Sequence, residues 1–247
     1  MDNRGAYLGS GKMFLEDLDD KKGLIFIGNC SSLEYAAEPE EIEEKNYTSP
    51  GGGLDNSVQR ISSVSVNYEA RHFKTANMAR AMFGSSAEVA SGTITAEEHK
   101  AYPGALLLLV NPGATDIVIT EATGSTELVE GTDYIINSAG MPEILESSTL
   151  VTPAGIDVKV AYKHEKYATI QALVASGKRY RMVFLGLNEA RSNKPVVIEV
   201  FRVNHSPANL SFIGDEFQGM TFSAKVEKDP TKIGSGVSQY LTIKDVD

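Results

Sequence analysis

Alternation of apolar and polar residues with a period of two is the feature that most restricts the fold of this chain. In the segment SVSVNYE, Val64, Val66 and Tyr68 fall on one face of an extended backbone. The other face carries small polar or acidic residues, namely Ser63, Ser65, Asn67 and Glu69. The same alternation recurs in IDVKVAY and in MTFSAKVEK, where Phe222, Ala224 and Val226 share a face. The chain is therefore predicted to consist mainly of strands with one buried and one solvated face.

Four further segments favour strands. RYRMVFLGL and VVIEVFRV are separated by NEARSNKP, whose Asn, Ser and Pro suit a turn. Near the N-terminus, GLIFIGN at 23–29 is short, apolar and bounded by glycines, which predicts a buried strand. QYLTIKD at 239–245 is predicted to form the last strand. By contrast, MFLEDLDDK at 13–21 has a weak helical spacing.

Helical signals are otherwise confined to one segment directly after the 63–69 strand. Thr75 can act as its N-cap, Met78 and Met82 stack at i, i+4, and Gly84 supplies the C′ stop. We expect Met78, Met82 and Phe83 to pack this helix onto the sheet. One short helix among many strands predicts an all-β fold, an antiparallel β-sandwich or partly open barrel.

Two stretches interrupt the strand pattern. Residues 31–57 are acidic and end in a glycine triplet, which predicts a long loop with either a function or no fixed structure. Turn signals also punctuate residues 111–153. We expect a small inserted β lobe there, or additional strands of the main sandwich, with residues 1–110 and 154–247 forming a discontinuous core.

Composition excludes several classes of function. The 247 residues hold 23 Lys+Arg against 33 Asp+Glu, a formal net charge of −10, so the chain lacks the excess of cations that gripping DNA requires. Cys30 is the only cysteine, which excludes an intrachain disulfide and argues against a cysteine-based zinc site. The N-terminus has no apolar signal region, and the run ALLLLV is too short to span a membrane. These features predict synthesis and folding in the cytoplasm.

The sequence offers no arrangement that is typical of catalysis. GSGK at 9–12 lacks both the earlier glycine and the Ser or Thr of a phosphate-binding loop. HEKYA ends in alanine where a second zinc ligand belongs, so His164 is interpreted as a surface residue at a strand end. The four histidines, including His72, His99 and His205, lie in separate segments. We therefore predict no enzymatic activity, no cofactor and no metal.

The order of these segments resembles the major tail tube protein of long-tailed bacteriophages. The resemblance begins with GAYLGSGKMFLEDL and GLIFIGNCSSLEY and continues with the acidic, glycine-rich stretch and SVSVNYEARHFKTANMARAMFGSSA. It continues through ELVEGTDYIINSAGMPEILE and AGIDVKVAYKHE. The most specific part is the closing block from YRMVFLGLNEA to FIGDEFQGMTFSAKVEKD. The likeness covers nearly the whole chain but contains no invariant active-site signature.

This resemblance implies a virion protein that self-assembles in the host cytoplasm. Six subunits would form a ring, rings would stack into a hollow tube, and strands of neighbouring subunits would join into a continuous inner barrel with the helix outside. Tail terminator, tape measure and tail tip proteins would be its partners besides further copies of itself. During genome ejection DNA would pass through the bore without specific binding, and no membrane would be involved.

The resemblance also suggests roles for residues. We expect Ser63, Ser65, Asn67, Glu69 and Glu227 to face the bore, where small polar and acidic side chains give DNA nothing to bind. Lys225 lies on the same predicted face and counts against this unless Glu227 offsets it. A ring-stacking arm would span residues 34–56, with six acids: Glu34, Glu38, Glu40, Glu41, Glu43 and Glu44. Its partners on the next ring would be basic residues such as Lys178, Arg179, Arg191 or Lys194.

Other interpretations remain open at this point. A tail terminator, head–tail joining or decoration protein would have a similar composition and β fold. A carbohydrate-binding or adhesion module would normally expose aromatic side chains, whereas Tyr134 and Tyr162 of the middle region fit core positions. An enzyme of unrecognised type is a further alternative.

Overall fold

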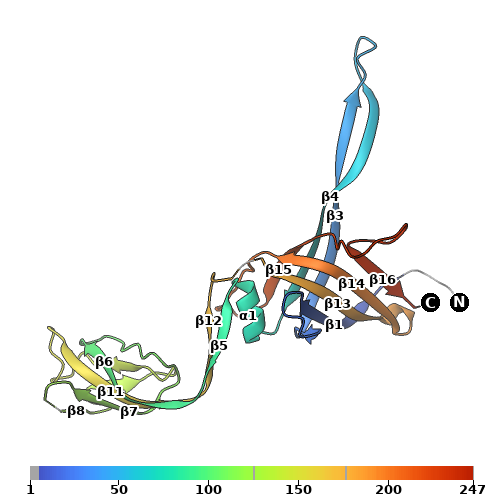
Figure 1. Ribbon diagram of the computed structural model, residues 1–247. Coiled ribbons are helices and arrows are strands. Elements are labelled where there is room, and N and C mark those ends of the chain that lie inside the picture. The colour runs from blue at the N-terminus through green and yellow to red at the C-terminus, as the bar shows by residue number, and fades with distance from the viewer. Residues whose placement is uncertain (1–5, 125, 176, 247) are drawn as a thin grey trace. The chain divides into compact units, whose positions relative to one another are not determined.

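The computed structural model describes residues 6–124, 126–175 and 177–246 (Figure 1). Two compact units are present, one made of residues 1–86 and 170–247 and the other of residues 87–169. Strands β5 (Ser85–Val89) and β12 (Tyr167–Gln171) pair with each other and contain both points at which the chain passes between the units. The strands of the main sheet in each unit pair in antiparallel fashion, and the prediction of an all-β fold is confirmed.

The first unit is built on one eight-stranded sheet with the order β2-β1-β13-β14-β15-β4-β3, in which β16 also pairs with β14. Its strands are β1 (Gly9–Asp17), β2 (Ile25–Phe26), β3 (Cys30–Lys45), β4 (Leu54–Ala70), β13 (Arg179–Asn188), β14 (Lys194–His205), β15 (Met220–Val226) and β16 (Leu241–Asp245). A short 3₁₀ helix (Glu189–Arg191) lies in the predicted turn between β13 and β14. The C-terminal half of β14 pairs with β15, whereas Val196–Val200 pair with β16.

This division of the β14 edge explains why β3 and β4 leave the sheet. β15 pairs with β4 only between Ser65 and Ala70, so the earlier residues of β4 pair with β3 alone. The two strands continue together as a long projecting hairpin (Figure 1). The prediction of a loop at 31–57 is therefore wrong for most of these residues, since only residues 46–53 form the connection between the two strands.

The core of the first unit lies on one face of the sheet. Val64, Val66 and Tyr68 are at most 5% exposed, and Phe222 stacks on Tyr68 with ring centroids 4.9 Å apart. The alternation predicted for β4 and β15 is thus confirmed. α1 (Thr75–Ala81) covers this face through Ala81 and the partly buried Met78.

The predicted helix exists, but its ends differ from the prediction. The N-cap is Lys74 rather than Thr75, and the C-cap is Met82. The residue with the left-handed backbone is Phe83, with φ of 48°, and not Gly84. Met82 and Phe83 consequently belong to the exit from the helix, and Met78 is the predicted packing residue that reaches the core.

Two N-terminal predictions are wrong for a common reason. The segment 13–21 is not helical, because β1 pairs with β13 over nine residues and buries Met13 and Leu15 on one face. The predicted buried strand at 23–29 is reduced to Ile25–Phe26, which is exposed at the sheet margin, while Ile27 is buried. In both cases long-range pairing overrides the local pattern.

The second unit has its own core and wider boundaries than the predicted lobe at 111–153. Its main sheet has the order β6-β11-β7-β8, and β9 pairs with β10. The strands are β6 (Gly92–Ala101), β7 (Thr115–Glu121), β8 (Glu127–Leu128), β9 (Tyr134–Ile136), β10 (Pro142–Ile144) and β11 (Ile156–His164). Because β11 pairs with β6 and β7, both flanking strands belong to this unit. Tyr134 and Tyr162 are core residues, as expected.

Burial of His205 generates a prediction about stability and pH. His205 is 4% exposed, its Nε2 lies 2.8 Å from the Tyr68 hydroxyl, and burial together with the charge of Arg80 lowers its pKa to about 3. The unfolded chain takes up a proton at this residue as the pH falls below its ordinary pKa of 6.5, whereas the folded protein does not. Stability should therefore fall by about 2 kcal/mol between pH 7 and pH 5.

Thermal and urea unfolding at the two pH values measure this effect. His205→Gln, which keeps a polar partner for Tyr68, should lose stability at pH 7 but show a smaller difference between pH 7 and pH 5. An unchanged pH dependence in this variant would show that His205 is not the group responsible.

Candidate functional site

The most distinctive feature of the first unit is the distal part of the hairpin, residues 38–45 and 54–61, which we call the ribbon. Each of these sixteen residues is exposed. Cross-strand pairing places Ile42 opposite Val58 and Glu40 opposite Arg60 on one face. The other face pairs Glu41 with Gln59 and Glu43 with Ser57. The ribbon is therefore an acidic two-stranded element with an apolar pair on each face, Ile42–Val58 near its middle and Pro39–Ile61 next to the sheet, and with none of the described residues packed as a layer against it.

The predicted stacking acids fall mainly on this ribbon. Glu38, Glu40, Glu41, Glu43 and Glu44 lie in it, whereas Glu34 lies where the hairpin still belongs to the sheet, opposite Asn67. The turn sequence NYTSPGGG between two extended runs was the signal from which the hairpin could have been predicted.

The polar face of the sheet brings together the residues predicted to line a bore. β4 pairs with β15 so that Ser65, Asn67 and Glu69 lie opposite Lys225, Ser223 and Thr221. Ser63 is on the same face, where it donates to Glu38 Oε2 at 2.6 Å and accepts from Lys225 Nζ at 3.3 Å. This face is opposite the core face, which α1 covers.

Arginines on the polar face hold carboxylates. Glu227 Oε1 lies 3.0 Å from Arg179 Nη2, and Glu227 Oε2 lies 2.8 Å from Arg202 Nε. Arg181 binds Glu199 at 2.8 Å and Glu16 at 3.3 Å. Hydrogen bonds from Arg179, followed by those from Arg202, hold the pKa of Glu227 below its usual 4.5. Glu227 is thus paired with two arginines, and not with Lys225.

Three of the four basic residues that were predicted to receive the arm already bind carboxylates within the subunit. Lys178 pairs with Asp17 at 2.8 Å, Arg179 with Glu227, and Arg191 with Asp245 at 2.8 Å. These cations are therefore weaker candidates for an acidic partner than the sequence suggested.

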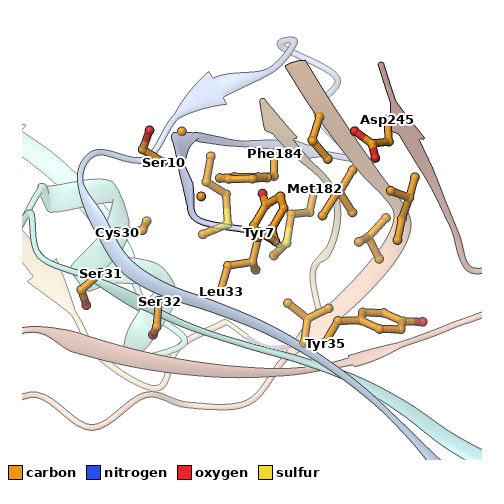
Figure 2. Close-up of a pocket in the computed structure, with 18 residues that line it drawn as sticks. Tyr7, Ser10, Cys30, Ser31, Ser32, Leu33, Tyr35, Met182, Phe184 and Asp245 are labelled. Atoms are coloured by element: carbon orange, nitrogen blue, oxygen red, sulfur yellow. The ribbon is translucent and has the colours of Figure 1, made fainter. Parts of the chain in front are cut away.

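A groove lies on the core face between the two margins of the sheet (Figure 2). Tyr7, Met182 and Phe184 lie in its middle, and Ser31, Ser32 and Leu33 of β3 line one side. Its volume is about 440 Å³. Since β1 and β3 both line it although they lie near opposite margins of the sheet, the sheet is curved into a barrel that does not close.

The chemistry of this groove suits packing rather than catalysis. Its lining is mainly aliphatic and aromatic, and burial raises the pKa of the Cys30 thiol to about 11, which keeps it protonated at neutral pH. Asp245 at the rim is occupied by Arg191. The groove can therefore hold an apolar group from another segment or molecule.

Two groups of titratable residues in the second unit have structural partners. In the second unit, Glu97 accepts from the Tyr162 hydroxyl and lies 2.7 Å from His99 Nε2. His164 is 8% exposed beside the rings of Tyr162 and Tyr167, so its predicted surface position is wrong. Within the described residues, no three His, Cys, Asp or Glu side chains gather in a way that could hold a metal ion. The described helices include none long and apolar enough to cross a membrane.

Comparison with family models matches residues 6–244 to a family described as protein of unknown function UCP028589. The chain belongs to this family. The match includes both units and the hairpin. No curated protein matches the chain.

The paired charges on the polar face generate a prediction. Glu227→Gln should lower the free energy of unfolding at pH 7 by about 1 kcal/mol, because the variant loses two charge-assisted hydrogen bonds. Since the pKa of Glu227 is lowered in the folded state, its contribution is present above the ordinary pKa and is lost as the pH falls through the folded value. The difference between the two proteins should therefore shrink in acid.

Urea unfolding at pH 7 and at about pH 3 tests this expectation. Glu189→Gln, at an exposed position of the 3₁₀ helix, serves as the matched control and should change stability by less than about 0.5 kcal/mol. A Glu227→Gln variant as stable as the parent at pH 7 would contradict the assigned pairing.

Proposed function

We propose that this chain is a structural subunit that assembles into stacked hexameric rings and forms the hollow tail tube of a long-tailed phage. The observation that carries the proposal is the ribbon, a sixteen-residue projection that has no hydrophobic layer of its own. An isolated two-stranded hairpin is marginally stable in water, so an element of this length fits a role in which another molecule covers it. The resemblance of the sequence to tail tube proteins supplies the identity of that molecule, another copy of the subunit.

Open sheet margins support lateral assembly into rings. Within the described residues, β2 pairs with the outer edge of β1 opposite Phe14 and Leu15, the Ile27 N–H donates to the Met13 carbonyl, and β3 pairs with β4 along one side. A long unpaired margin invites pairing with another chain. A ring uses this property, because one heterologous contact repeated around an axis joins each margin to that of a neighbour.

The polar face supports passage of DNA without binding. A wall that attracts DNA needs cations free to replace the counterions of phosphate. Here Arg179, Arg181 and Arg202 each hold a carboxylate. Lys225 donates to the neutral Ser63 hydroxyl, which leaves its charge uncompensated, and it is the residue of this face that counts against weak binding. The remaining residues predicted to face the bore are small, polar or acidic. A bore lined by this face would bind DNA weakly.

A terminator or joining protein is the principal alternative, and polymer length distinguishes it. Negative-stain electron microscopy of the concentrated protein should show hollow cylinders of variable length. Single rings that never stack would favour the terminator, and a protein that stays monomeric at high concentration would overturn the proposal.

Shortening the ribbon tests its assigned role. Replacing residues 40–59 by an Asn-Gly turn should leave the thermal midpoint of the subunit within about 2 °C of the parent, because the deleted residues make no core contacts. The shortened protein should form rings but no cylinders. Cylinders of normal length would remove the ribbon from the stacking contact.

A further inference from the structure

The loop between β14 and β15 exposes the largest apolar side chains of the first unit. Phe217 is 96% exposed, Ile213 is 94% exposed and Phe212 is 71% exposed. They lie in the irregular segment 210–219, which we call the apolar loop. Side chains of this size that gather on one short segment mark an interaction surface rather than ordinary scatter.

The apolar loop and the ribbon lie at opposite ends of one strand. β4 runs from the ribbon, at Leu54, to Ala70, which pairs with Met220 at the start of β15. The adjacent Arg71 donates from Nη1 to the Phe217 carbonyl at 2.7 Å, and the rings of Phe73 and Phe212 are 6.2 Å apart. These contacts fix the loop at the far end of β4, about 55 Å along the strand from the hairpin turn.

The ribbon offers a matching surface. On one face, the Ile42–Val58 pair is flanked by the Glu40–Arg60 pair and by Glu44. Ile42 is 46% exposed and Val58 is 47% exposed, so this patch is also uncovered in the subunit. The opposite face carries Glu41, Gln59 and Glu43, and its apolar pair, Pro39 with Ile61, lies at the end of the ribbon next to the sheet.

Charges around both patches permit docking. Arg71 lies beside the apolar loop but already binds Glu69, with 3.1 Å between Arg71 Nη2 and Glu69 Oε2. The loop itself carries two carboxylates, Asp215 and Glu216, which can meet Arg60 beside the Ile42–Val58 pair of the ribbon. This pairing of opposite charges favours docking of the two surfaces.

We propose that the apolar loop of one copy binds the Ile42–Val58 face of the ribbon of a second copy. This inference rests on the proposed function and identifies the surface to which the ribbon binds. Complementary patches at opposite ends of one molecule produce a head-to-tail contact that repeats without limit, as a stack of rings requires. Two exposed phenylalanines offer about 300–500 Å² for burial. If the ribbon and its flanking residues bury a similar area, the total buried surface approaches the ~1,000 Å² of a specific interface.

Cross-linking of the full chain tests this contact. One preparation carries Val58→Cys and another Ile213→Cys, both on a Cys30→Ser background, and a short bismaleimide reagent is added to the assembled mixture. Covalent dimers should form in the mixture and stay at background in either preparation alone. Gln59→Cys, the neighbouring position on the other ribbon face, should give background yield with Ile213→Cys. Equal yields from positions 58 and 59, or none from either, would overturn the proposal.

A second measurement does not depend on cysteine chemistry. The double variant Ile213→Ser, Phe217→Ser alters two side chains that are 94% and 96% exposed, leaves the Phe73–Phe212 contact in place, and should form rings that do not stack. Ile233→Ser, at a residue that is 85% exposed in a different loop, should form cylinders like the parent. Normal cylinders from the double variant would refute this binding surface while leaving the proposed function intact. A parent protein that neither assembles nor cross-links would refute both.

Discussion

A two-stranded ribbon cannot enclose a core, and this constraint governs the rest of the molecule. The ribbon exists because β16 pairs with Val196–Val200 of β14 and thereby occupies the edge along which β15 would otherwise continue beside β4. In the ribbon, within the described residues, the strands β3 and β4 pair only with each other. Their side chains must therefore either remain in water or be covered by another molecule. The exposure of the Ile42–Val58 pair favours the second outcome.

The two faces of the sheet that carries the ribbon have different physical roles. Val66, Tyr68 and Phe222 pack beneath α1 on one face and supply the hydrophobic core. The other face is polar, and its arginines are neutralised by Glu227, Glu199 and Glu16. Such a face is stable in water without attracting a polyanion. The division requires only strict alternation along the strands, which the sequence provides.

Alternation was also what made much of the fold predictable. The buried faces of β4, β11 and β15 could be identified because each has apolar residues at every second position, as in Val158, Val160 and Tyr162. Where long-range strand pairing determined the secondary structure of a segment, the local sequence pattern gave the wrong prediction. Met13 and Leu15 have a helical spacing with their neighbours but lie in a strand, because β13 pairs with them. Because β3 contains many glutamates and Pro39, its sequence predicted a loop instead of a strand.

The sequence predicted which segments form the candidate surfaces better than it predicted which side chains contact one another there. The acidic residues and the face of Ser63 were identified from composition and period, whereas the partners of Arg179 and Arg202 depend on β13, β14 and β15 meeting in space. Nothing in the local sequence FIGDEF of the apolar loop indicates that Phe212 and Ile213 are uncovered. Exposure is a property of the tertiary structure and cannot be determined from residue type alone.

Amide hydrogen exchange tests the central claim most directly. In dilute protein the amides of residues 38–45 and 54–61 should exchange rapidly, because the ribbon opens readily without a covering layer. In concentrated, assembled protein the same amides should become strongly protected, while the amides of β11 in the second unit should change little. Slow exchange of the ribbon in a dilute monomer, or rapid exchange in the assembled protein, would contradict the account.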